Sequence, residues 1–113
     1  FEPDDRFAIR RAKEYSKNSL SSSQIQLIKG INCVESLRLQ EAESLLKPLV
    51  ENVALSREIR SEASYNLAEA LREQKRTLDA IPMYLKAIEA EPQEERWVMP
   101  WSYYRIAEIY YNA

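Results

Sequence analysis

Apolar residues recur at intervals of three and four along most of the chain, which is the spacing of one face of an α-helix. The clearest stretch is 61–92, where apolar positions run from Leu67 to Ala87, break near 75–77 and stop at Pro92. This pattern predicts two amphipathic helices packed antiparallel, with alanines where their backbones approach. The same periodicity predicts an all-α chain of about six helices, near residues 4–18, 22–36, 38–51, 56–74, 77–90 and 97–112.

Small residues lie at matched places in this pattern. The interval from Gly30 to Ala42 equals the interval from Ala68 to Ala80, so the second pair repeats the first. Gly30 is the only glycine and lies inside a predicted helix, where it costs about 1 kcal/mol relative to alanine. We therefore expect a partner helix to approach Gly30 closely. Cys33, on the same helix, is predicted to be a small buried hydrophobe.

Capping residues and prolines predict where several helices begin and bend. Ser56, followed by acidic residues, predicts the start of the fourth helix, which we expect to be extended by one extra helical turn. Thr77 is the expected N-cap of the fifth helix, and Pro100 suits the first turn of the sixth. Pro48 and Pro82 fall inside predicted helices, where we expect bends rather than breaks.

One stretch carries a family resemblance. Its small residue, the alanine twelve positions later, the aromatic residue four after that and the closing proline are Ala68, Ala80, Tyr84 and Pro92. This spacing resembles the tetratricopeptide repeat, whose unit is about 34 residues long. Ser64 departs from the pattern, because the repeat has an aromatic residue there. The small residues at positions 30, 68 and 107 follow one another at intervals longer than this unit, which marks a divergent array.

The resemblance implies a right-handed superhelix of antiparallel helix pairs, an α-α solenoid. It covers nearly the whole chain as a single domain, 1–113, with a half repeat at 1–20, repeats at 21–56 and 57–93, and a half repeat at 94–113. A helical repeat buries its apolar face only against neighbouring repeats. We therefore expect the chain to be a piece of a larger protein.

The amino-acid composition excludes several classes of function. The 113 residues carry a net charge of -2 and no histidine, which removes the commonest general base and metal ligand. A lone cysteine gives no metal cluster, and a single glycine gives no phosphate-binding loop. No basic footprint and no apolar run of about 18 residues is present. We therefore expect no enzyme, cofactor, metal, nucleic acid or membrane insertion, while a cytoplasmic and a bacterial periplasmic location fit equally well.

The resemblance implies a non-catalytic scaffold whose first helices line a concave groove for a protein or peptide segment. Carried over by position, the predicted groove residues are Leu27, Ile31, Tyr65, Glu69, Arg72, Trp101, Tyr104, Glu108 and Tyr111. One subclass of the family clamps a C-terminal carboxylate with lysines, asparagines and an arginine. Only Asn66 and Arg105 match that set here, so we do not predict carboxylate-tail binding.

Two alternatives remain open at this stage. The last predicted helix has an apolar face at Trp101, Tyr103, Ile106, Ala107 and Tyr110, without a partner helix after it in this sequence. That face predicts self-association, either with a second copy or with the face of the first helix around Phe7, Ala8 and Tyr15. The other alternative is a spacer within a larger repeat protein, whose groove binds nothing.

Overall fold

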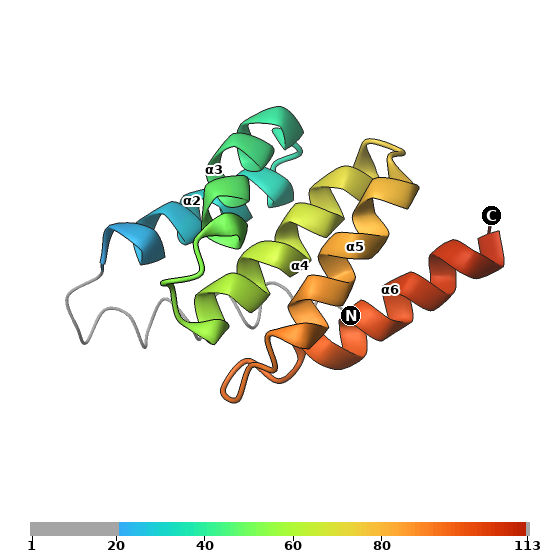
Figure 1. Cartoon of the computed structure of the whole chain (residues 1–113). Coiled ribbons are helices and arrows are strands. Elements are labelled where there is room, and N and C mark those ends of the chain that lie inside the picture. Colours follow the sequence, from blue (N-terminus) through green and yellow to red (C-terminus); the bar gives the residue numbers. More distant parts are fainter. Residues whose placement is uncertain (1–20, 113) are drawn as a thin grey trace.

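The computed structural model describes residues 21–112, which form five α-helices and no strand in that range (Figure 1). The helices are α2 (Ser22–Glu35), α3 (Leu39–Glu51), α4 (Arg57–Glu73), α5 (Thr77–Glu89) and α6 (Val98–Asn112). The all-helical prediction is confirmed for these residues, and every helix end lies within one residue of its predicted place. The helix predicted at 4–18 lies outside the described residues.

The predicted helix starts are partly confirmed. Ser56 is the N-cap of α4, and its hydroxyl accepts a hydrogen bond from the Ile59 N–H at 3.2 Å. The prediction for Thr77 is wrong, because the cap position of α5 is Arg76 and Thr77 is already helical. The turn between α4 and α5 leads directly into helix at Thr77, so the N-cap lies one residue earlier than predicted. Pro48 and Pro82 lie within α3 and α5, and both helices continue through them.

The same turn joins α2 to α3 and α4 to α5. Each turn has a residue in the left-handed region, Leu37 at a φ of 61° and Lys75 at a φ of 67°. In each, the N–H of the next residue donates to a carbonyl five residues earlier, at 2.8 and 2.9 Å. These bonds define the Schellman motif that commonly ends helices. Leu37 and Lys75 are separated by the same interval as Gly30 and Ala68, so the two turns lie at matching places in the sequence.

Helix α4 is the centre of the described structure. It packs against α2, α3, α5 and α6, and Figure 1 shows it inside the row of helices with α6 at one end. Gly30 of α2 is buried, and a Cβ at this position would lie 2.7 Å from Cγ of Leu46 in α3. The expected close approach at Gly30 is thus confirmed. Cys33 is buried in the core as predicted, and its thiol donates to Glu41 at 3.0 Å.

The loop between α5 and α6 is held by one side chain of α4. The Glu58 carboxylate accepts hydrogen bonds from three consecutive backbone N–H groups, those of residues 93, 94 and 95, at 2.8, 3.3 and 3.2 Å. Val98, the first residue of α6, is fully buried beyond this loop. Glu58 therefore helps to fix where α6 begins. Within residues 21–112, no helix combines the length and the apolar content needed to cross a membrane.

Candidate functional site

A cluster of charged and aromatic side chains lies where α4, α5 and α6 meet. At its centre, the Glu69 carboxylate accepts hydrogen bonds from Arg72 Nη2 at 2.8 Å, Tyr84 Oη at 2.9 Å and Arg105 Nε at 2.9 Å. Arg105 Nη1 also donates to Glu108 at 3.0 Å. We call Glu69, Arg72, Tyr84, Arg105 and Glu108 the Glu69 cluster. Its members come from three helices, so the cluster ties these helices together.

Burial and charge act against each other at Glu69. Only 12% of its side chain is exposed, and this burial on its own would raise the pKa of the carboxyl group. The positive charges of Arg72 and Arg105 and the hydrogen bonds from Arg72 and Tyr84 outweigh burial, so the pKa of Glu69 lies below its ordinary value. Burial and the neighbouring carboxylate raise the pKa of the Tyr84 phenol. Glu69 is therefore ionised and Tyr84 neutral at pH 7.

Aromatic rings of α6 cover the outer side of this cluster. The Arg105 guanidinium carbon lies 5.7 Å from the Trp101 ring centroid and 5.8 Å from that of Tyr104. These distances are those of cation–π contacts. The two rings meet edge to face with centroids 5.6 Å apart. Trp101 is half-buried, whereas 54% of Tyr104 is exposed, so the cluster presents an aromatic edge to solvent.

The structure brings five of the nine predicted groove residues together around Arg105. They are Glu69, Arg72, Trp101, Tyr104 and Glu108, and each contacts Arg105 or shares Glu69 with it. Tyr111 lies farther along α6 and is 90% exposed. The six predicted groove residues that are at least partly exposed thus all come from α4 and α6.

The three remaining predicted residues lie in the core instead of lining a surface. Leu27, Ile31 and Tyr65 are 1%, 6% and 3% exposed. Tyr65 packs edge to face against Tyr84 and Trp97, with ring centroids 5.7 and 5.3 Å apart. Transfer by position identifies a helix but does not say whether a large side chain turns toward the groove or the core. These side chains are not accessible to a partner in this structure.

Two members of the cluster were not predicted as site residues. The sequence indicates Arg105 only as a partial match to a carboxylate clamp, and Tyr84 only as the aromatic position of the repeat pattern. The spacing of Arg105 and Glu108, three residues apart on one helix, is an available signal for an ion pair. Asn66, the other clamp match, is buried and donates to the Glu62 carbonyl of its own helix at 2.9 Å.

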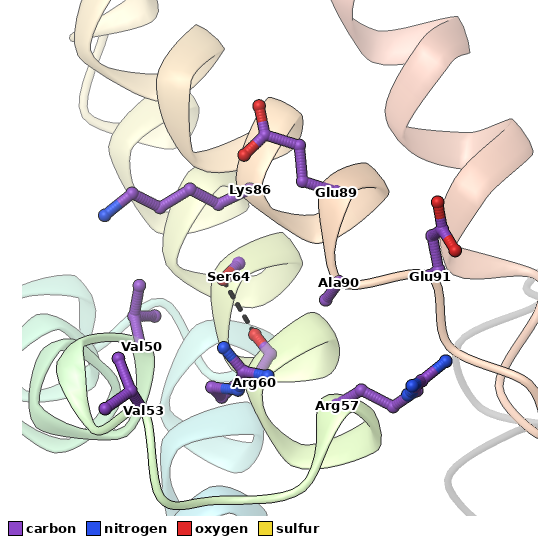
Figure 2. Close-up of a pocket in the computed structure, with 9 residues that line it drawn as sticks. All are labelled: Val50, Val53, Arg57, Arg60, Ser64, Lys86, Glu89, Ala90 and Glu91. Carbon is purple, nitrogen blue, oxygen red and sulfur yellow. Dashed lines mark hydrogen bonds between the residues drawn. The ribbon is translucent and has the colours of Figure 1, made fainter.

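A cavity of about 570 Å³ opens on another part of the surface, between the end of α3, the start of α4 and the end of α5 (Figure 2). None of the predicted groove residues lines it. Its lining residues are Val50, Val53, Arg57, Arg60, Ser64, Lys86, Glu89, Ala90 and Glu91. Figure 2 shows Arg57 and Lys86 on different sides of the space, with the Glu89 carboxylate directed away from both. The charges do not converge on one point, so we assign no ligand to this cavity.

Comparison of the chain with protein-family models, with curated proteins and with solved structures finds no match. Functional inference therefore depends on the geometry of this molecule. Within the described range 21–112, no group of three or more histidine, cysteine, aspartate or glutamate side chains is placed to hold a metal ion. The distinctive features of the site are the ion-paired Glu69 cluster and the exposed tyrosines beside it.

Proposed function

We propose that the chain is a non-catalytic, tetratricopeptide-like scaffold that holds a segment of another protein on the surface of α4 and α6. One observation carries this proposal: Tyr104 is exposed to solvent while its ring packs against Arg105, a member of the ion-paired Glu69 cluster. Tyr104 is in edge-to-face contact with Trp101 and in cation–π contact with Arg105. An exposed ring held in place loses little conformational entropy on binding, which makes it an effective anchor.

Internal similarity supports the repeat architecture in this proposal. The helix pairs α2–α3 and α4–α5 share the Schellman turn, at residues 37 and 75. They also share buried small residues at the same interval, Gly30 with Ala68 and Ala42 with Ala80. A right-handed superhelix of such pairs would place α2, α4 and α6 along one surface. We propose that the binding face is the α4–α6 part of that surface.

The chemistry of this face favours a particular kind of segment. Tyr104 and Tyr111 are 54% and 90% exposed and offer ring surface to apolar side chains. The partly exposed carboxylate of Glu108 lies beside them and is paired with Arg105. Arg72 and Arg105 are each paired with Glu69 and with one further carboxylate, so their positive charges are already compensated and hold an additional anion poorly. We therefore propose a segment that binds through apolar or aromatic side chains rather than through a carboxylate.

Selection from a display library of random short peptides against the immobilised chain tests this proposal. We expect the wild-type chain to enrich peptides with a shared apolar or aromatic pattern. Tyr104→Lys should abolish their binding, whereas Leu78→Lys, which changes an exposed apolar residue of α5, should not. Circular dichroism melting should show that both variants fold. Failure to enrich any peptide would favour the spacer alternative, whereas binding that Tyr104→Lys leaves intact would refute the assignment of the binding face to Tyr104.

A further inference from the structure

Four tyrosines dominate the exposed face of α6. Tyr103, Tyr104, Tyr110 and Tyr111 are 58%, 54%, 67% and 90% exposed, and Ala107 is exposed between them. We call these five residues the tyrosine face. The other exposed residues of this helix, Pro100 and Asn112, are also uncharged. A contiguous apolar and aromatic surface of this kind marks a site of protein association.

Equivalent positions within the same chain show how such a face is normally covered. Tyr103, Ala107 and Tyr110 repeat, at one constant interval, a set on α4 that consists of Ser64, Ala68 and Leu71. The α4 set is 2%, 0% and 5% exposed, because α4 is packed between neighbouring helices. Helix α6 lies at the end of the row in Figure 1 and, among the described helices, contacts only α4 and α5.

The order of large and small residues on the tyrosine face is self-complementary. Ala107 lies in the middle, with one tyrosine pair a helical turn before it and another a turn after it. If a second copy of α6 crosses antiparallel with its Ala107 opposite this one, the backbones can approach closely. Each tyrosine pair at 103–104 then meets the pair at 110–111 of the second copy. We propose that two copies of the chain associate in this way, around a two-fold axis beside Ala107.

Charge and area set the strength of this association. The charged residues nearest the face, Arg105 and Glu108, pair with each other, so docking leaves no charge without a partner. At their observed exposures, the four tyrosines present about 500 Å² of surface in each copy. Two copies would then bury about 1,000 Å² in total, below the size of a standard stable interface. The pair is therefore a weak, reversible dimer that forms at high protein concentration.

Light scattering after size exclusion, over a wide concentration range, tests the dimer. We expect the mass of the wild-type chain to rise from one copy to two and to stop there. Ala107→Arg should keep the chain monomeric at every concentration with an unchanged melting temperature, because Ala107 is exposed. Leu78→Arg adds the same charge to an exposed residue of α5 and should still dimerise. A wild-type monomer throughout, a mass that grows beyond two copies, or a dimeric Ala107→Arg variant would overturn the proposal.

Disulfide cross-linking tests the antiparallel geometry. In Ala107→Cys, the two new thiols meet near the axis, where their Cα atoms can reach the roughly 4–7 Å that a disulfide requires. We expect this variant to form a covalent dimer under mild oxidation. In Tyr103→Cys, the two thiols lie about 12 Å apart along the helices and should not link. The native Cys33 is buried, so the wild-type chain should not cross-link and is the negative control. Equal linking of both variants would indicate a parallel pair, and no linking of Ala107→Cys would refute the axis.

The dimer does not depend on the proposed peptide binding. Ala107 is not among the residues assigned to the α4–α6 binding face, whereas Tyr104 and Tyr111 belong to both surfaces. A chain whose Ala107→Arg variant is monomeric but still binds selected peptides would support both proposals. Loss of peptide enrichment in the wild-type chain, together with a normal wild-type dimer, would refute only the proposed function.

Discussion

Replacing Gly30 with alanine tests the close approach of α2 and α3. In an isolated helix this change is favourable, because alanine is preferred over glycine by about 1 kcal/mol. In this fold the new Cβ would lie 2.7 Å from Cγ of Leu46, a fully buried side chain that would have to shift to admit it. Adding a carbon to a tightly packed site costs about 1–3 kcal/mol. We therefore expect Gly30→Ala to lower the free energy of unfolding by about 1 kcal/mol, the difference between these two effects.

A double-mutant cycle with Leu46→Ala isolates the contact. Leu46→Ala alone should cost about 2–5 kcal/mol, because it leaves a cavity in the core. With Leu46 truncated, the Cβ at position 30 has space, and Gly30→Ala should become stabilising by about 1 kcal/mol. The coupling energy between the two sites is then about 2 kcal/mol, within the range for residues in contact.

Urea denaturation followed by circular dichroism measures all four free energies of the cycle. Asn32→Ala, an exposed change on the same helix, is the matched control and should be slightly stabilising. The steric reasoning would be refuted if Gly30→Ala raised the denaturation midpoint as much as the control does. A coupling energy near zero would show that the contact with Leu46 does not decide the residue at position 30.

Two further predictions follow from burial and charge. Because the pKa of Glu69 is lowered in the folded state, its ionised form stabilises the fold above about pH 4.5, and this stabilisation is lost as pH falls through the folded-state pKa. Glu69→Gln should thus lower the free energy of unfolding by about 2 kcal/mol at pH 7 and by much less at pH 3. Urea denaturation at the two pH values measures both losses. Equal losses would contradict the ionised state assigned to Glu69. Ala68→Arg should unfold the domain, because Ala68 is fully buried, whereas Ala107→Arg should melt as the wild type does. Circular dichroism melting compares the two, and a folded Ala68→Arg variant would show that α4 and its neighbours are less tightly packed.

The helices were predictable because local signals agree with one another. Apolar periodicity, the Ser56 cap and the interval between Gly30 and Ala68 all point to the same helix boundaries, and the structure has them within one residue. Thr77 was misassigned because threonine is a common cap, while the preceding Schellman turn restarts the helix at Arg76 through backbone bonds alone. The left-handed conformation of Lys75 could not be predicted from the sequence, because glycine is the residue that usually indicates it.

The site was predictable only as a set of candidates. Transfer by position from the repeat put Glu69 and Arg72 among the candidates, and the structure joins these two side chains in an ion pair. The contact between Glu69 and Arg105 joins residues 36 positions apart and depends on how α6 is rotated against α4. The burial of Tyr65 likewise depends on its contacts with Tyr84 and Trp97, two rings from other elements. No local pattern encodes these relative rotations, so neither arrangement could be read from spacing.

The two Schellman turns show where this protein could gain heat resistance. Leu37 and Lys75 adopt the left-handed conformation, which costs a residue with a side chain about 1 kcal/mol relative to glycine. Both residues are exposed, so removing their side chains would cost little packing. The flexibility of glycine in the unfolded chain would offset part of the gain. The only glycine of the chain is instead at the close contact with Leu46, so both turns are formed by residues for which the left-handed conformation is unfavourable.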